Sequence, residues 1–246
     1  MNDALTARQA QILKALIDEY IEAAEAVGSE VLEKKYNLGV SSATVRNEMV
    51  TLTKMGYLKQ LHTSAGRVPT PKAMKFYVNQ LMEEKQMSLV DEVKAKEEVW
   101  DHRADVDKLM DEATQSLASR TRNLSFAVID DGSGRSWHAG LANVFADPEF
   151  TDLNTCANVF SFIEESNRMI DTIMRRFDKI SSNMDVIFGE ELRWPGFEPV
   201  GMVTTRLTVR GKNGALGIIG PVRMQFPTVI PVVRYFGNMV EEVANA

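Results

Sequence analysis

Apolar residues recur at three-and-four spacing along the N-terminal part of the chain, a pattern typical of short amphipathic helices. The first such segment extends from Leu5 to Ala24, with its apolar stripe at Ile12, Leu13, Leu16, Ile17, Tyr20 and Ile21. The polar residues between them are Lys14, Asp18, Glu19 and Glu22. Gly28 breaks the pattern. Ser29 then begins a second, shorter helix, whose predicted apolar face is Val31, Leu32 and Tyr36.

A third helix is predicted to begin directly after Ser41, because a serine side chain is suited to cap a helix N-terminus. On a helical wheel, Val45, Met49 and Leu52 fall close together and are expected to face inward. The opposite, outward face carries Ala43, Arg46, Asn47, Val50 and Lys54.

A predicted hairpin follows the third helix. Its strands are expected at residues 57–61 and 68–70, with a turn-rich stretch between them. Residues 72–82 are expected to form a closing helix. Three short helices followed by a hairpin are the pattern of the winged helix-turn-helix, whose third helix enters the major groove of DNA.

The remainder of the chain changes in character. Residues 83–119 are charged and contain no proline or glycine, which predicts one or two long helices that either pair with a second copy or pack on the following domain. Strand and helix patterns then alternate, with strands expected at 124–129, 184–188, 202–209 and 215–219, and helices at 151–178 and 228–242. Asn213-Gly214 is a strong signal for the turn joining the last two strands.

The predicted fold class is therefore α+β, with a mainly antiparallel sheet in the C-terminal part. We expect a winged helix-turn-helix domain at 1–85, a helical linker at 86–120 and a second globular domain at 121–246. Of the 246 residues, 44% are apolar and 25% are charged, as in average soluble globular proteins. Neither a membrane-length apolar run nor a secretory signal is present, so the expected location is cytoplasmic, without a membrane partner.

Charge is distributed unevenly along the chain. The net charge is −6, yet residues 41–75 contain six basic residues and one acidic residue, a local charge of +5 that leaves −11 for the rest. A basic island on an acidic protein is typical of a local, oriented site for an anion rather than of a generally adhesive surface. This distribution points first to DNA.

Candidate DNA contacts lie on the outward face of the third helix. Arginine matches guanine and asparagine matches adenine through paired hydrogen bonds, so Arg46 and Asn47 are the candidates for reading bases. Ala43 is a candidate for contact with a thymine methyl group. Ser42 and Thr44, in the first turn, are candidates for holding a phosphate, although Thr44 could instead cap the helix.

The hairpin supplies further cations and hydrogen-bond donors around Gly66, a residue that would let the backbone approach DNA closely. The candidates for DNA contact here and at the end of the third helix are Lys54, Lys59, His62, Thr63, Ser64 and Arg67. Arg67 could reach the minor groove or grip a phosphate. The alternative for His62 and Thr63 is a purely structural turn.

Several segments of the chain resemble the HrcA family of heat-inducible transcription repressors. In the N-terminal part they are LTARQ at 5–9, EYI at 19–21, VGS at 27–29, SSATVRN at 41–47, GYL at 56–58 and HTSAGRVPT at 62–70. In the C-terminal part they are AGLAN at 139–143, PEF at 148–150 and LGIIGPVRM at 216–224. The chain departs from the usual residues of the family at Ser42, Leu61 and 73–75, and the second of these departures, Leu61, touches the wing.

The resemblance implies a GAF-like domain at 121–246 and a homodimer that binds double-stranded DNA at the CIRCE inverted repeat ahead of chaperone genes. It also implies relief of repression by heat and dependence on the chaperonin GroEL. Family members carry a dimerising domain inserted in the GAF-like domain. Only about ten residues separate Ile129 from AGLAN here, so that insertion is expected to be missing. Dimerisation of two chains is then expected through the GAF-like domain and residues 86–120.

No enzyme, cofactor or metal site is expected, because neither HExxH nor GxSxG nor a GxxxxGK[ST] phosphate loop occurs in the sequence. Cys156 is the single cysteine, interpreted as a small core residue rather than a reactive thiol. Arg223 is interpreted as an interdomain or dimer contact, with an anion site as the alternative. A ligand-sensing regulator with a small-molecule pocket in the GAF-like domain and a coiled-coil scaffold are the rival functions.

Overall fold

The computed structural model describes residues 4–62, 65–192 and 194–246 of the chain. These residues form two compact units, Met1–Glu83 and Glu84–Ala246, which are described separately below. The segment predicted as a helical linker, 86–120, lies within the second unit.

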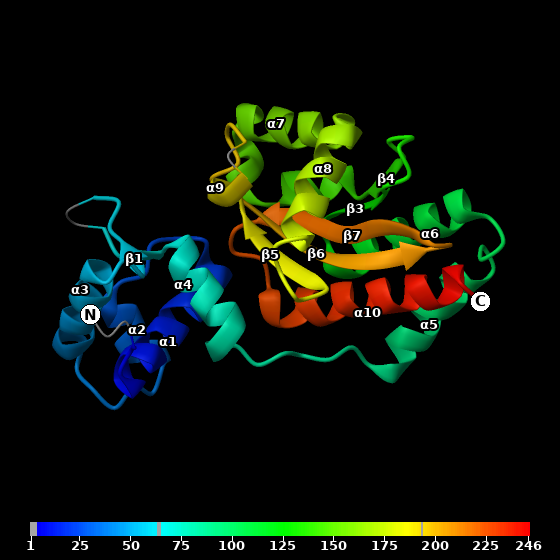
Figure 1. The fold of residues 1–246 in the computed structure, drawn as a ribbon. Coiled ribbons are helices and arrows are strands. Elements are labelled where there is room, and N and C mark those ends of the chain that lie inside the picture. The colour runs from blue at the N-terminus through cyan, green and yellow to red at the C-terminus, as the bar shows by residue number, and fades with distance from the viewer. Residues whose placement is uncertain (1–3, 63–64, 193) are drawn as a thin grey trace. The chain divides into compact units, whose positions relative to one another are not determined.

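The first unit is built from helices and one small hairpin (Figure 1). Its elements are α1 (Ala7–Ala23), α2 (Ser29–Lys35), α3 (Ser42–Lys54), β1 (Leu58–Lys59), β2 (Val68–Pro69), α4 (Pro71–Phe76) and the π-helical turn η1 (Tyr77–Leu81). The three predicted helices, the hairpin and the closing helix occur in that order. The strands are shorter than expected, with two residues paired on each side.

Helix α1 begins two residues after its expected start, directly behind the cap residue Thr6. The Thr6 side chain accepts a hydrogen bond from the Gln9 backbone, and the Gln9 side chain returns one to the Thr6 backbone, which forms a capping box. The expected apolar stripe is buried except for Tyr20, which is half-buried. Tyr77 closes this core and donates a hydrogen bond of 2.6 Å to Asp18. Burial, together with that hydrogen bond, raises the pKa of Tyr77.

Helix α2 differs from the prediction. Of its expected apolar face only Leu32 is fully buried, while Val31 remains 39% exposed. Glu19 of α1, which the periodicity places among outward polar positions, is instead 4% exposed. Its carboxylate accepts hydrogen bonds from Lys35 at 2.9 Å and 3.0 Å and from the Tyr36 hydroxyl at 3.3 Å. The buried Glu19 carboxylate is stable here because these donors replace the hydrogen bonds that it would make to water. Burial of the Tyr36 hydroxyl, next to the negative charge of Glu19, raises the pKa of Tyr36 to about 12.

The second unit is a sheet covered by helices on both faces. Its helices are α5 (Leu89–Trp100), α6 (Val106–Thr121), α7 (Leu153–Glu164), α8 (Ser166–Phe177), α9 (Gly189–Leu192) and α10 (Phe226–Ala244), with the 3₁₀ turns η2 (Leu141–Ala146) and η3 (Pro148–Thr151). Its strands are β3 (Leu124–Ile129), β4 (Ser136–Ala139), β5 (Met184–Phe188), β6 (Val200–Val209) and β7 (Lys212–Pro221). The strand order is β4-β3-β7-β6-β5, and every neighbouring pair is antiparallel. The predicted mixed fold with a mainly antiparallel sheet is confirmed.

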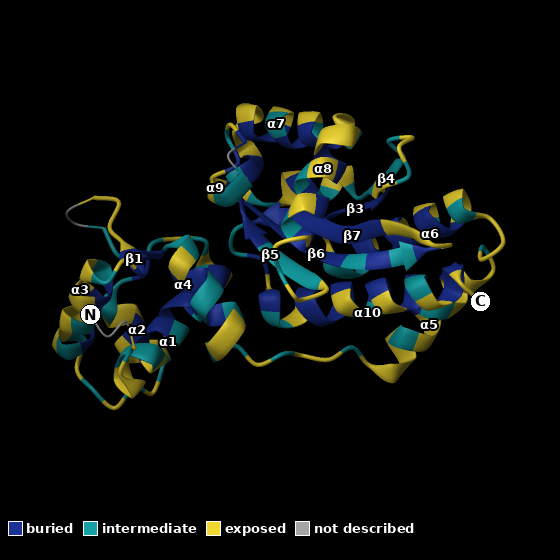
Figure 2. Cartoon of the chain, in the orientation of Figure 1, coloured by how far each residue is buried: buried dark blue, intermediate teal, exposed yellow. Residues whose placement is uncertain are grey.

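Helices α6 and α10 pack on one face of this sheet and α8 on the other (Figure 1). Strand β3 is therefore buried along its whole length instead of alternating between buried and exposed positions. Figure 2 shows this pattern as dark blue strands between helices that are yellow on their outer sides. The hydroxyl of Ser125, within β3, donates a hydrogen bond of 2.6 Å to the Thr114 carbonyl in α6.

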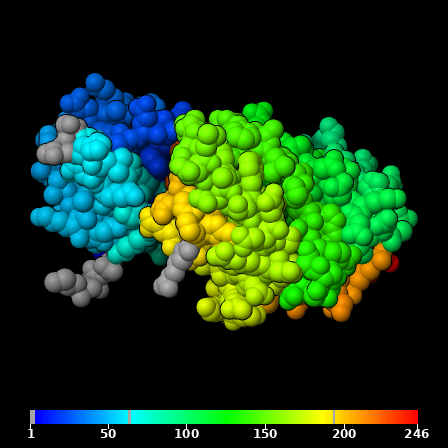
Figure 3. Space-filling model, turned by 90° about the horizontal axis from the view of Figure 1, so that it is seen from above, coloured from blue at the N-terminus to red at the C-terminus, as the bar shows by residue number. Residues whose placement is uncertain are grey.

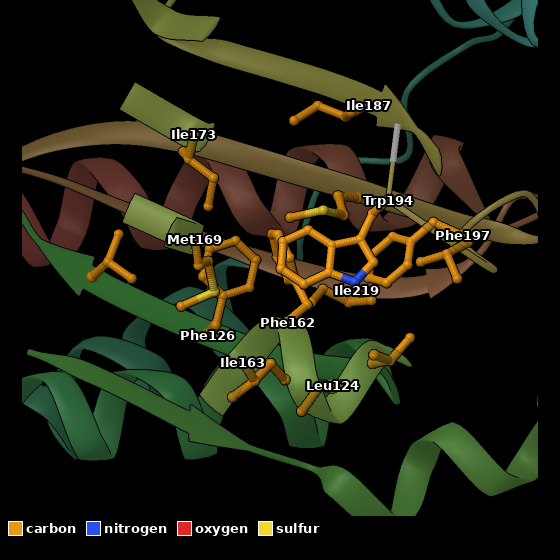
Figure 4. Close-up of a cluster of buried hydrophobic side chains, with 14 of the residues drawn as sticks. Leu124, Phe126, Phe162, Ile163, Met169, Ile173, Ile187, Trp194, Phe197 and Ile219 are labelled. Carbon is orange, nitrogen blue, oxygen red and sulfur yellow. The ribbon is translucent and has the colours of Figure 1, made fainter. Parts of the chain in front are cut away.

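An aromatic cluster forms the core on the side of α7 and α8 (Figure 4). The Phe162 ring meets Trp194 edge-on at a centroid distance of 4.8 Å and Phe197 at 5.3 Å. Fully burying an apolar side chain of this kind contributes about 1.5–3 kcal/mol. The long helix expected at 151–178 is interrupted at Glu165, whose φ of −80° and ψ of 57° are not helical.

The hairpin between β6 and β7 turns at a different place from the expected one. Its two turn residues are Arg210 and Gly211, with φ values of 48° and 77°, because Val209 pairs with Lys212. Asn213 and Gly214 lie inside the β6–β7 ladder. The left-handed conformation of Arg210 costs about 1–2 kcal/mol. This cost is offset by hydrogen bonds that the Arg210 guanidinium donates to the backbone carbonyls of residues 103 and 104, at 3.0 Å and 2.8 Å.

Candidate nucleic-acid interface

Helix α3 has one buried and one exposed side, as the sequence predicts. Val45, Met49 and Leu52 are 0%, 4% and 0% exposed and attach the helix to the core of the first unit. Ser41 caps the helix, and its hydroxyl accepts a hydrogen bond of 3.4 Å from the Thr44 backbone. The yellow outer side of α3 in Figure 2 is the predicted outward face.

Three polar residues of that face are exposed and lack internal partners. Within the part of the chain that the structure describes, the side chains of Arg46, Asn47 and Lys54 make neither a hydrogen bond nor an ion pair. Elsewhere in the same unit, Lys14 reaches Asp18 at 2.9 Å and Lys35 reaches Glu19 at 2.9 Å. The donors of α3 are therefore available to a group outside the protein.

Of the other candidates for DNA contact at the start of α3, two are less exposed, and one of these already takes part in the helix cap. Ala43 is exposed, whereas Ser42 and Thr44 are half-buried. The Thr44 hydroxyl lies 3.2 Å from the Ser41 hydroxyl, so both take part in the cap. Glu48, the acidic residue of the basic island, is half-buried and accepts a hydrogen bond of 3.1 Å from Gln9 of α1. This bond ties the N-terminal part of α1 to the middle of α3.

The hairpin places two more candidates in solvent. Lys59 and His62 are exposed, and neither side chain has a hydrogen-bond or ion-pair partner among residues 4–62, 65–192 and 194–246. The His62 carbonyl accepts a backbone bond of 2.9 Å from Ala65. Thr63 and Ser64, also predicted to contact DNA, lie outside the described residues.

Arg67 is half-buried and has structural partners. Its Nε donates a hydrogen bond of 3.2 Å to the Thr53 hydroxyl on α3. Its backbone exchanges two bonds of 2.9 Å with Val27 in the loop between α1 and α2. Arg67 thus joins the hairpin to α3 and to that loop. Thr53, which positions Arg67, was not among the predicted residues, because a separation of 14 residues leaves no local signal in the sequence.

Gly66 has a structural role inside the first unit. A Cβ atom at this position would lie 2.5 Å from the Val27 backbone, closer than real contacts allow. Its lack of a side chain therefore permits the pairing of the hairpin with Val27. The close approach of DNA at this glycine stays a prediction.

Thr70 and Lys72, which follow the hairpin, connect it to the end of α3 and to α4. The Thr70 hydroxyl donates a bond of 2.7 Å to the Gly56 carbonyl and also caps α4 by accepting from the Ala73 backbone. Lys72 donates a bond of 3.1 Å to the Met55 carbonyl and lies 4.4 Å from the centre of the Tyr57 ring. The Thr-Pro pair that begins α4 is a readable helix-start signal, whereas the bonds to the end of α3 were not foreseen.

The other segments that carry the family resemblance meet inside the second unit. Arg223, in GPVRM, contacts Glu149 of PEF at 2.6 Å and Asp147 at 2.9 Å. The Arg223 side chain is 12% exposed. Burial raises the pKa of Asp147, against the opposing effect of Arg223. Arg223 thus joins the end of β7 to the η3 region within one unit, and the contact between domains or subunits and the anion site stay predictions.

Other candidate chemistry in the described part of the chain is limited. Cys156 is 3% exposed and donates a hydrogen bond of 2.9 Å to the Phe150 carbonyl, and burial raises the pKa of its thiol. It is a core residue, as expected. No group of three metal-binding side chains occurs among the described residues. Nor does any described helix have both the length and the apolar character required to span a bilayer.

Comparison with known proteins identifies related sequences. The family model described as the HrcA protein C terminal domain matches residues 38–230. A heat-inducible transcription repressor HrcA of Clostridium acetobutylicum is 37% identical over 179 residues, which cover 72% of this chain and 49% of that protein. The chain thus spans about half the length of this curated relative.

A second relative aligns along its whole length. The heat-inducible transcription repressor HrcA of Geobacter sulfurreducens is 25% identical over 337 positions, which cover 97% of this chain and 98% of that protein. Since 97% of 246 residues is about 239, about a hundred aligned positions have no counterpart here. The chain is therefore about a hundred residues shorter than this relative.

A solved structure supports the fold. A protein described as a hypothetical protein, with a crystal structure at 2.2 Å resolution, superposes with a TM-score of 0.72 at 16% identity. The match covers 98% of each chain. At this identity the likeness concerns the fold alone.

Proposed function

Because this chain belongs to the HrcA family, we propose that it is a heat-inducible transcription repressor that binds the CIRCE inverted repeat through α3. The observation that carries the proposal is the outward face of α3, where Arg46, Asn47 and Lys54 are exposed without internal partners in the described structure. Three helices followed by a hairpin support interpreting the first unit as a winged helix-turn-helix domain. We place its action in the cytoplasm.

In this proposal α3 lies in the major groove. Arg46 forms paired hydrogen bonds to guanine, Asn47 does so to adenine, and Ala43 contacts a thymine methyl group. Contacts to the phosphate backbone come from Ser42, Thr44, Lys54, Lys59, His62, Thr63 and Ser64, with Arg67 at the minor groove or on a phosphate. Phosphate contacts supply most of the affinity, and the base contacts supply the specificity.

The inverted repeat requires two copies of α3, so we propose a homodimer. The sheet of the second unit, covered by helices on both faces, supports interpreting that unit as GAF-like. About a hundred positions of the longer relative have no counterpart in this chain. We therefore propose that two chains dimerise through the second unit, including its segment 86–120. Light scattering at micromolar concentration should give the mass of two chains; a mass of one chain with and without operator would contradict this step.

Relief by heat follows from linkage between folding and DNA binding. Operator DNA binds the folded repressor, so occupancy falls when heat populates inactive forms. The chaperonin GroEL would maintain the active form and become unavailable when denatured proteins compete for it. Adding purified GroEL to heat-treated repressor should restore operator binding, and adding it together with excess denatured protein should not.

The deciding experiment is fluorescence anisotropy with a CIRCE duplex and a scrambled duplex across a salt series. We expect selective binding to CIRCE that is lost in Arg46→Ala. The matched control is Arg175→Ala, which removes one exposed arginine from α8 of the second unit. Equal binding of both duplexes by the unaltered protein, or equal losses in the two variants, would refute base recognition by α3.

A further inference from the structure

A cleft of about 380 Å³ lies on the second unit, bounded by β4, η2, the C-terminal end of α7 and the start of α8. Figure 3 looks onto the side of the molecule that carries α7 and α8, drawn in yellow-green. The cleft volume falls within the range typical of sites for small organic molecules. Nothing in the proposed DNA contacts uses these residues.

One side of the cleft is apolar. Leu141, Phe160 and Ile163 line it, and Ile163 also belongs to the buried core (Figure 4), which keeps this wall in a defined position. The Phe160 ring lies edge-on to that of Phe145 at 6.1 Å. Leu141 and Phe145 are 41% and 61% exposed. Exposed apolar surface beside a cleft favours an apolar or aromatic ligand body, because covering it removes that surface from water.

The polar groups of the cleft favour a positively charged head group. Glu164 is the charged residue of the lining, and within the described structure its carboxylate has neither a hydrogen-bond nor an ion-pair partner. It is the last residue of the 12-residue helix α7. The neighbouring Glu165, by contrast, contacts Arg168 at 3.2 Å.

Hydrogen-bonding groups complete the site. The hydroxyls of Ser136 and Ser166 lie 2.9 Å apart and join β4 to the start of α8. One of them donates to the other, and both retain lone pairs that can accept a further N–H. The His138 imidazole, also in the lining, can likewise accept a hydrogen bond when neutral. Acceptors thus stand beside an unpaired carboxylate.

We propose that this cleft binds a small organic ammonium compound with an aromatic or aliphatic body. The body lies against Leu141, Phe160 and Ile163, the ammonium group pairs with Glu164, and the remaining N–H groups meet the serine hydroxyls. The proposal does not depend on DNA binding, since neither the ligand nor the cleft involves the first unit.

The test uses the full chain and phenethylamine, which joins one aromatic ring to a primary ammonium group. Titration calorimetry and amide chemical shifts should show saturable binding, with shifts at residues 138, 141, 160 and 163–166. Phenylacetate, of similar size but carrying a carboxylate, should bind at least about tenfold more weakly. No saturable phenethylamine binding up to millimolar concentration, or equal affinity for phenylacetate, would overturn the proposal.

Two pairs of variants locate the contacts. Glu164→Gln removes the charge and should weaken phenethylamine binding about tenfold, whereas Glu165→Gln should leave it within twofold. Leu141→Ala should weaken binding several-fold, while Leu153→Ala, at a leucine 77% exposed outside the cleft, should not. Circular dichroism establishes that each variant is folded. Equal effects within either pair would place the ligand elsewhere and contradict the proposal.

Discussion

Four arginines of the second unit and three basic residues on α3 and the hairpin of the first unit are used in opposite ways. In the second unit, Arg223, Arg234, Arg120 and Arg176 each reach a carboxylate within 2.9 Å. In the first unit, Arg46, Lys54 and Lys59 have no such partner among the described residues. A cation that is paired internally stabilises the fold, while an unpaired, exposed one contributes little to stability and remains available to a phosphate or a base. The comparison separates structural charge from charge available for recognition.

The largest expected effect is at the most buried of these ion pairs. Arg223→Ala leaves Glu149 and Asp147, with side chains 15% and 27% exposed, without their shared cation. Removing one partner of a buried pair costs about 3–5 kcal/mol. Urea denaturation should show a loss of this order in the second unit. A change below about 1 kcal/mol would mean that Arg223 is not a structural cation.

Arg46 should behave in the opposite way. Arg46→Ala removes an exposed side chain without a partner in the described structure, so stability should change by less than about 0.5 kcal/mol. Operator affinity should fall about tenfold or more, which corresponds to about 1.4 kcal/mol, because one paired contact to a base is lost. Anisotropy and thermal unfolding of the same samples measure both quantities. A loss of stability with affinity unchanged would reverse the assignment.

Arg67 tests the intermediate case, because it is half-buried and bonded to Thr53. Arg67→Ala should cost about 1 kcal/mol of stability through the lost hydrogen bond and should also weaken operator binding. Thr53→Val removes the same bond but keeps the arginine. If Thr53→Val matches Arg67→Ala in DNA affinity, the arginine positions the hairpin and does not touch DNA.

Lys59 should show a smaller, electrostatic effect. A phosphate contact carries no sequence information, so Lys59→Ala should weaken binding to CIRCE and scrambled duplexes by a similar factor. The slope of log affinity against log salt should decrease in magnitude by about one. A change in the ratio of the two affinities would instead indicate that Lys59 contributes to base recognition.

The smallest effect is expected at an exposed ion pair. Arg175 contacts Asp171 at 3.2 Å, with the two side chains 75% and 67% exposed. Solvent and salt screen such a pair, so Arg175→Ala should change stability by less than about 0.5 kcal/mol. Denaturation in low and high salt checks this. A loss comparable to that of Arg223→Ala would show that pairing alone, rather than burial, determines the cost.

Much of the candidate interface was readable from local patterns. Helical periodicity alone separated Val45, Met49 and Leu52 from Arg46 and Asn47, because side chains at those spacings share one side of any helix. The same logic failed for Glu19, which is buried because Lys35 and Tyr36 from the following segment supply its hydrogen bonds. A local period contains no information about such a donor.

By itself, the sequence determined the buried stripes of α1 and α3, the mainly antiparallel sheet, the basic island and the family resemblance, since each depends on residue types at short spacings. The tertiary structure decided the rest. It moved the β6–β7 turn to Arg210-Gly211, because strand register is decided by packing and by bonds from distant segments. It also joined Arg223 to Glu149, 74 residues away, and left Arg46 without a partner in the described chain. Whether a charge is paired depends on distances in space, which only the folded chain defines.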